Sequence, residues 1–340
     1  MSDASDTATP VPPIEMLPWH DGARERLRIA LDGGRLPHAL LLHGPSGVGK
    51  ERFASALAAA LFCSRRAATL RACGECADCA LSRAGSHPDL HWLRPLEDRK
   101  SIAVEQVRDA CGQLGMTSLR GGHRVAIVTP AQAMTRSAQN ALLKTLEEPP
   151  PRTLLVLVTA RPSSLAPTLR SRCQRIEIPR PPESVTLGWL ASEIEGELAP
   201  GLLAIAGGAP LKALELAPHF PGLQAQMTGT IENFLAGRIE VTRAADDLMG
   251  DGLPARLDWI EGWLGTLVRR RVLPDGTQLT LPEGPVLQRL AGEVNISAAF
   301  RALDRLRETR RLLEGPAAAQ LAVEVLLMDL RAALGRRGVV

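Results

Sequence analysis

The sequence lacks a long apolar run and a strong net charge, and we expect no secretory leader at its start. Its apolar stretch at 154–159 has the length of a buried strand, well short of the roughly 20 residues that cross a bilayer. Residues 1–13 have neither a basic start nor an apolar stretch, which is typical of a loose tail and not of a signal peptide. A net charge of +3 does not by itself indicate nucleic-acid binding. We therefore expect a soluble, cytoplasmic protein.

Cysteine is also scarce, with six residues in 340, but four of the six are clustered. In a reducing compartment such clustering favours a metal site over a disulfide framework. Four thiolates complete a tetrahedral zinc site and leave no open position for a substrate, so the metal would be structural. The expected ligands are Cys63, Cys73, Cys76 and Cys79, with His87 as the alternative to Cys63.

Short apolar runs of strand length alternate with helical patterns between residues 39 and 178. This alternation predicts an α/β domain, a parallel sheet covered by helices. Helical spacing of apolar residues supplies the connections, and three prolines at 149–151 end the last one. The expected strands are 39–42, 90–93, 125–128, 154–158 and 176–178, and the expected helices are 51–62, 104–114 and 131–148.

Beyond residue 180 the strand-like runs cease, and the pattern stays helical. Short helices separated by Gly207-Gly208 are expected over 187–216, and longer amphipathic ones at 257–268, 303–313 and 317–334. The absence of a fixed-period repeat argues against a solenoid. The expected organisation is a tail at 1–13, an α/β domain at 14–180 with a zinc-binding insertion at 63–79, a helical lid domain at 181–220 and an all-helical domain at 221–340.

A phosphate-binding loop follows the first expected strand and opens a helix. Its glycines would let backbone N–H groups surround a triphosphate, and its lysine would reach the outer phosphates. The segment runs from Gly44 through Gly47 and Gly49 to Lys50. We therefore expect a nucleotide site, at least by ancestry.

Two residues that a hydrolysing site of this kind needs are missing. Glu51 stands where a serine or threonine would bind magnesium. Thr129 and Pro130 follow the strand at 125–128, where a working ATPase carries acidic residues. ATP binding is compatible with these changes, but ATP hydrolysis is not expected.

Three segments resemble bacterial clamp-loader subunits of the AAA+ family. They are 140–150 (NALLKTLEEPP), Ser171-Arg172-Cys173, and the cysteine cluster inserted behind the phosphate loop. The resemblance covers about 17–178. Within the family, the tau and gamma motor subunits keep an intact phosphate loop and an acidic pair, which this sequence replaces, so it is more similar to the delta-prime type. That type implies a non-catalytic subunit of DNA polymerase III that acts in DNA replication.

The resemblance also implies partners and roles for single residues. Such a subunit joins three motor subunits (tau/gamma) and one delta subunit in a ring that loads the sliding clamp onto primed DNA. Arg172 would be the arginine finger that reaches the ATP of the adjacent motor subunit. Leu211 stands where the lid domain usually presents an arginine to the nucleotide, and Lys212 is one residue further along. Residues 221–340 would form the collar that holds the ring together.

Three alternatives remain open from the sequence. An ATPase motor with unusual metal ligands is supported by Gly49-Lys50. A zinc-dependent DNA-binding module is disfavoured because no aromatic or basic cluster accompanies the cysteines. Arg172, taken without its flanking motifs, would be an ordinary solvated salt bridge.

Overall fold

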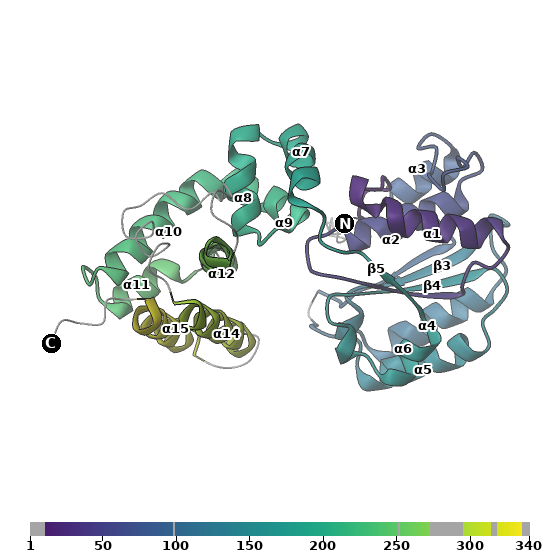
Figure 1. The fold of residues 1–340 in the computed structure, drawn as a ribbon. Coiled ribbons are helices and arrows are strands. Elements are labelled where there is room, and N and C mark those ends of the chain that lie inside the picture. Colours follow the sequence, from purple (N-terminus) through teal and green to yellow (C-terminus); the bar gives the residue numbers. More distant parts are fainter. Residues whose placement is uncertain (1–10, 98, 251, 273–294, 314–317, 335–340) are drawn as a thin grey trace, which may run out of the picture. The chain divides into compact units, whose positions relative to one another are not determined.

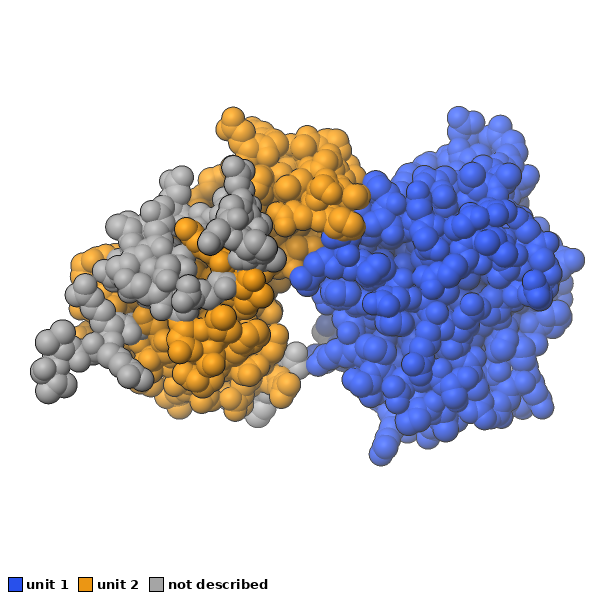
Figure 2. All heavy atoms as spheres, viewed as in Figure 1, with its two compact units in different colours: residues 1–181 blue, residues 182–340 orange. Residues whose placement is uncertain are grey.

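The computed structural model describes residues 11–97, 99–250, 252–272, 295–313 and 318–334. The chain divides into two compact units, Met1–Pro181 and Pro182–Val340, which Figure 2 colours separately. Among the described residues, no helix is both long and apolar enough to span a membrane.

The first unit contains a five-stranded sheet in which every pairing is parallel. The strand order is β2-β3-β4-β1-β5, and the register places Leu41 beside Leu157. All five predicted strands are confirmed, with bounds that differ by at most two residues. The strands are β1 (Ala39–His43), β2 (Leu90–Leu93), β3 (Arg124–Val128), β4 (Thr153–Thr159) and β5 (Gln174–Glu177).

Alternate residues along each strand point to opposite faces of the sheet, and both faces are buried. Leu40 and Leu42 belong to one core, and Leu41 belongs to the other. The first core lies under α1 (Asp21–Asp32) and α2 (Lys50–Phe62), and the second lies under α4 (Val104–Gly115), α5 (Arg136–Glu147) and α6 (Pro167–Arg172) (Figure 1). The unit is therefore a three-layer α/β sandwich, as expected.

The helix predicted at 131–148 is wrong at its start. Residues Ala131–Ala133 form a separate 3-10 turn, η2, and the α-helix begins only at Arg136. The reason is local: Thr135 has an extended backbone, and its hydroxyl accepts a hydrogen bond from the Ala138 N–H at 3.1 Å. A threonine in this position caps the helix and sets its first residue.

The described chain starts before the predicted domain boundary at residue 14. The carbonyl of Pro12 accepts a hydrogen bond of 2.8 Å from the Ser55 hydroxyl on α2. Residues 11–13 therefore belong to the first unit instead of the expected tail, and residues 1–10 lie outside the described part. The remaining helical pieces of this unit are η1 (Pro18–His20), α3 (Ala77–Arg83) and η3 (Pro162–Ser164).

The second unit is helical throughout its described residues and has one hydrophobic core. Trp259, Trp263 and Phe234 are fully buried in it, and its members run from Leu190 to Leu334. The division into a lid at 181–220 and a collar at 221–340 stays a prediction. The helices are α7 (Glu183–Glu193), η4 (Gly196–Leu198), α8 (Ala199–Ile205), α9 (Pro210–Leu216), η5 (Ala217–His219), α10 (Phe220–Leu235), α11 (Val241–Leu248), α12 (Leu253–Val272), α14 (Ile296–Leu313) and α15 (Ala319–Leu334).

Candidate functional site

The phosphate loop joins β1 to α2 and depends on glycine at two close contacts. Gly44 has φ +149°, and a Cβ there would lie 2.0 Å from the carbonyl oxygen of Ile178. Gly49 has φ +84°, and its Cβ would lie 2.6 Å from Leu17 Cδ1. The positive φ angles favour glycine at both positions, and at Gly44 the neighbouring backbone of Ile178 also leaves no room for a Cβ.

Lys50, the first residue of α2, lies back over the loop. Its Nζ donates a hydrogen bond of 2.6 Å to the Pro45 carbonyl, and the residue is only 8% exposed. Burial lowers the pKa of Lys50 to about 8, partly opposed by the charge of Glu51. A buried ammonium at the start of a helix is suited to an anionic ligand.

The N-terminal segment braces this loop, a feature that sequence reasoning missed. Trp19 Nε1 donates to the Val48 carbonyl at 2.9 Å, and His20 Nε2 lies 3.3 Å from the same oxygen. His20 Nδ1 accepts the Leu17 N–H at 3.2 Å, so the proton of the neutral ring is on Nε2. Burial lowers the pKa of His20 to about 4.

Glu51 connects the two positions where metal-binding residues are missing. One carboxylate oxygen accepts a hydrogen bond of 2.7 Å from the Thr129 hydroxyl at the end of β3. The other lies 3.2 Å from a guanidinium nitrogen of Arg94, which directly follows β2. Sequence reasoning did not identify Arg94, although its place after a predicted strand was a usable signal, because parallel strands end at one edge of a sheet.

These residues do not fit the magnesium ion that a phosphate loop usually employs. Mg²⁺ requires near-octahedral oxygen ligands. Both oxygens of Glu51 are already engaged, and one of them has a guanidinium beside it. Neither Thr129 nor Pro130 offers the carboxylate that would hold a metal here.

Arg172 ends α6 at the surface of the first unit. Its guanidinium donates to Glu147 Oε1 at 2.6 Å and to the Thr168 carbonyl at 3.1 Å. The Arg172 side chain is 37% exposed, and that of Glu147 is 52% exposed. The salt bridge weighed as the alternative is therefore present, and the guanidinium at its end remains partly accessible.

Lys212 is engaged within the second unit. Its Nζ lies 2.7 Å from Asp258 on α12, and Arg310 on α14 contacts the same carboxylate at 2.6 Å. Lys212 thus ties α9 to α12, and its neighbour Leu211 is a partly buried apolar residue. The arrangement is that of a structural ion cluster.

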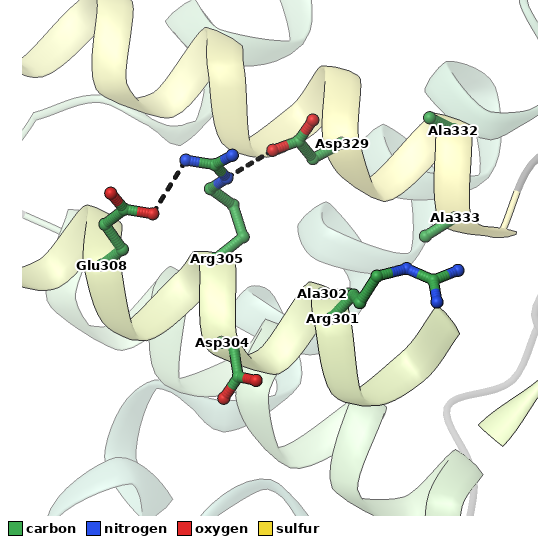
Figure 3. A pocket seen from close by; sticks show the side chains of 8 residues that line it. All are labelled: Arg301, Ala302, Asp304, Arg305, Glu308, Asp329, Ala332 and Ala333. Carbon is green, nitrogen blue, oxygen red and sulfur yellow. Dashed lines mark hydrogen bonds and ion pairs between the residues drawn. The ribbon is translucent and has the colours of Figure 1, made fainter. Parts of the chain in front are cut away.

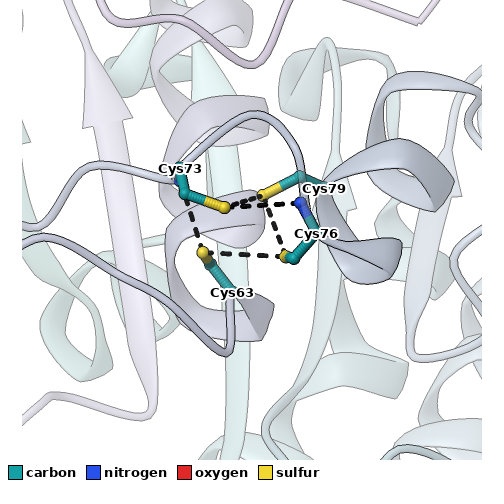
Figure 4. Close-up of side chains that lie close together, drawn as sticks. All are labelled: Cys63, Cys73, Cys76 and Cys79. Atoms are coloured by element: carbon teal, nitrogen blue, oxygen red, sulfur yellow. Dashed lines mark hydrogen bonds between the residues drawn. The ribbon is translucent and has the colours of Figure 1, made fainter.

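The four clustered cysteines meet in space, with all four sulfur atoms within 4.8 Å of one another (Figure 4). Three of the Sγ–Sγ distances are 3.9 Å for Cys73–Cys79, 3.8 Å for Cys63–Cys76 and 3.4 Å for Cys76–Cys79. A zinc tetrahedron with bonds of about 2.3 Å has edges of about 3.8 Å. The cluster could therefore hold a metal ion of this size.

The surrounding backbone favours thiolates in part of this cluster. N–H groups of Glu75 and Cys76 lower the pKa of Cys73, and the Cys73 N–H in turn donates to Cys63 Sγ at 3.3 Å. Burial raises the pKa of Cys79 to about 12, a penalty that a bound cation would offset.

His87, the alternative fourth ligand, packs elsewhere. Its ring stacks on Phe62 with centroids 3.8 Å apart, and its Nε2 lies 3.6 Å from Asp78. Among the described residues, the group of side chains that can hold a metal consists of Cys63, Cys73, Cys76 and Cys79 and does not include His87.

A hollow of about 520 Å³ between α14 and α15 is the other candidate (Figure 3). Arg305 pairs there with Glu308 at 2.8 Å and with Asp329. None of the described residues that line it is a histidine, cysteine or serine. Two of its carboxylates, Glu308 and Asp329, are engaged by Arg305, and the phosphate loop and the cysteine cluster remain the sites to explain.

Comparison with known proteins assigns the family. Residues 19–182 match the family described as DNA polymerase III, delta subunit. A DNA polymerase III subunit delta′ of Pseudomonas aeruginosa is 39% identical over 277 residues, 79% of this chain and 82% of the relative. That of Haemophilus influenzae is 30% identical over 92% of this chain and 95% of its own. A gamma/tau subunit of Mycobacterium tuberculosis is 32% identical over 56% of this chain but 34% of its own length. The chain therefore belongs to the delta′ subunit family of DNA polymerase III.

Proposed function

We propose that this chain is a clamp-loader subunit that does not hydrolyse ATP and instead assists hydrolysis in a neighbour. The observation that carries this proposal is the contact of Glu51 with Thr129 and Arg94. Glu51 and Thr129 stand at the two positions whose side chains hold magnesium and orient water in a working ATPase, and Arg94 contacts Glu51. A phosphate loop that lacks both the magnesium ligand and the acidic residue can still bind phosphates, but it lacks the side chains that phosphoryl transfer requires.

Arg172 is the residue that would act on the neighbouring subunit. A guanidinium supplied in trans offsets charge on the transferred phosphoryl group, an effect of about 10³ to 10⁵ in rate in other systems. The side chain is partly exposed and held by one carboxylate, Glu147. Such an exposed pair contributes only about 0–1 kcal/mol, so a phosphate from a partner can replace Glu147 at small cost.

The partners in this proposal are the tau/gamma motor subunits, the delta subunit, the sliding clamp and primed DNA. Zinc bound by Cys63, Cys73, Cys76 and Cys79 would have a structural role, because the four thiols leave no open coordination position. The collar role of 221–340 belongs to the same proposal.

The test is ATP turnover in a reconstituted loader. The chain alone should release no phosphate, and Arg172→Ala should leave the complex assembled while slowing its turnover at least about 10-fold. Arg175→Ala, a neighbouring exposed arginine on β5, is the matched control and should be neutral. Unchanged turnover with Arg172→Ala would contradict the finger.

An ATPase motor remains the second candidate, because Lys50 lies over the loop as a motor would require. That function predicts DNA-stimulated phosphate release by the purified chain, abolished by Lys50→Ala. Absence of release in the wild-type chain would exclude it.

A further inference from the structure

We propose that the guanidinium of Arg94 takes the place of the magnesium ion, so that this phosphate loop binds an oligophosphate, such as a nucleoside triphosphate, without metal. The inference rests on the proposed function in one respect: the site holds its ligand and does not hydrolyse it. The ligand is then a metal-free oligophosphate, and Arg94 is a binding residue that lies outside the loop motif.

Glu51 stands at the position of the loop that usually binds the metal. In a working loop, the residue after the lysine binds Mg²⁺ through its hydroxyl, and the ion bridges the outer phosphates. Here that residue is Glu51, whose carboxylate holds a guanidinium nitrogen of Arg94 at 3.2 Å. A cation therefore contacts the same residue that would otherwise bind the metal.

Arg94 is held in place by contacts of its side chain and its backbone. Its guanidinium carbon lies 4.5 Å from the centre of the Trp92 ring, and its side chain is only 16% exposed. Its carbonyl accepts a hydrogen bond of 2.9 Å from Gln106 on α4. A guanidinium fixed in this way is a preorganised cation, and its planar donor fork suits phosphate oxygens.

The charges around the loop favour a ligand that carries no metal ion. Lys50 and Arg94 are cationic and Glu51 is anionic, and the start of α2 adds a partial positive charge. A metal-free triphosphate meets two fixed cations there. A magnesium complex would instead bring a second cation beside the guanidinium, where like charges repel. Magnesium should therefore not strengthen binding.

The experiment measures affinity by titration calorimetry on the full chain. The ligands are ATP and inorganic tripolyphosphate, each in EDTA and in excess Mg²⁺. We expect wild type to bind in EDTA at least as tightly as in Mg²⁺, and Arg94→Gln to weaken binding about tenfold. Arg99→Gln, an exposed arginine on the same connection, removes the same charge and should change affinity less than about twofold.

Two further variants test the guanidinium fork and the missing metal ligands separately. Arg94→Lys keeps the charge but loses the fork, so it should bind with affinity between wild type and Arg94→Gln. The double variant Glu51→Thr with Thr129→Asp restores metal ligands, and its binding should become stronger in Mg²⁺ than in EDTA. Thermal unfolding of each variant identifies any that fail to fold.

The outcomes are distinct. Equal affinity for both ligands would support recognition of the phosphates alone, and tighter ATP binding would support recognition of the nucleoside as well. Wild-type binding that requires Mg²⁺, an Arg94→Gln affinity equal to that of Arg99→Gln, or no binding of either ligand at millimolar concentration would overturn the inference. Phosphate release in the same samples would contradict the proposed function, whichever way the affinities fall.

Discussion

Single residues decide the chemistry of this phosphate loop. The loop has its lysine and its glycines, and Lys50 lies close over the backbone. The next residue, Glu51, accepts hydrogen bonds from Thr129 and Arg94. A hydroxyl at that position would be a metal ligand, whereas the carboxylate forms hydrogen bonds within the protein. We therefore expect Glu51 to affect metal binding while the loop's backbone is kept.

His20 makes the stability of the first unit depend on pH. Its pKa is lowered from 6.5 to about 4 in the fold, chiefly by burial. Between these values the unfolded chain binds a proton that the folded chain does not, so stability is complete above pH 6.5 and falls as pH drops toward 4. The contribution of this one group should fall by about 2 kcal/mol between pH 7 and pH 5.

Urea unfolding at both pH values measures this effect. His20→Gln removes the titrating ring, so the free energy of unfolding of the variant should depend less on pH, by about 2 kcal/mol over the same interval. An identical pH dependence in both proteins would show that His20 does not titrate as its burial implies.

Residues outside motifs were the hardest to predict from sequence. The four cysteines and the loop glycines were recognisable because their spacing reflects local geometry. Arg94 contacts Glu51, which lies 43 positions away in the sequence. Trp19 contacts Val48, which lies 29 positions away. No local pattern encodes such contacts, since they depend on which strand ends and loops the fold brings together.

At the scale of elements, the loop between β1 and α2 is constrained by the chain that passes it. Gly44→Ala would place a methyl group 2.0 Å from the Ile178 carbonyl, in addition to backbone strain at φ +149°. We expect a loss of about 3 kcal/mol in the free energy of unfolding. Gly112→Ala on α4 meets nothing within 4 Å and should instead stabilise by about 0.5–1 kcal/mol. Similar midpoints in denaturant for the two variants would contradict this account.

The cysteine module is the element whose order should depend on metal. Cys76→Ser removes one of the four sulfur atoms, so we expect loss of bound zinc and of about 3 kcal/mol or more in stability. Cys111→Ser lies outside the cluster and should retain the full zinc content. Metal analysis and thermal unfolding measure both, and a Cys76→Ser protein that keeps one zinc per chain would contradict the assignment.

Element positions were predicted well where apolar periodicity is strong. The central strands β1, β3 and β4 were found because they are buried on both faces and therefore read as continuous apolar runs, whereas in the edge strand β5 only Ile176 is buried. The start of α5 was misplaced because the residues before Thr135 continue the apolar pattern, and only the cap at Thr135 sets the boundary. The pairing of Arg172 with Glu147 could not be predicted, since it joins the ends of two different helices.

On the scale of the whole molecule, the first unit combines a parallel sheet and a phosphate loop with direct contacts of Glu51 to Thr129 and Arg94. The same unit presents Arg172 on its surface, held only by an exposed carboxylate and a helix carbonyl. This combination suits a subunit whose contribution is made to a neighbour. The delta′ relatives, which this chain matches over most of its length, are named as subunits of DNA polymerase III.

The most direct measurement is a structure of the reconstituted loader with a non-hydrolysable ATP analogue in the adjacent motor subunit. We predict that the Arg172 guanidinium leaves Glu147 and lies about 3 Å from a γ-phosphate oxygen of the neighbour. An Arg172 that remains paired with Glu147, with another side chain contacting that phosphate, would contradict it.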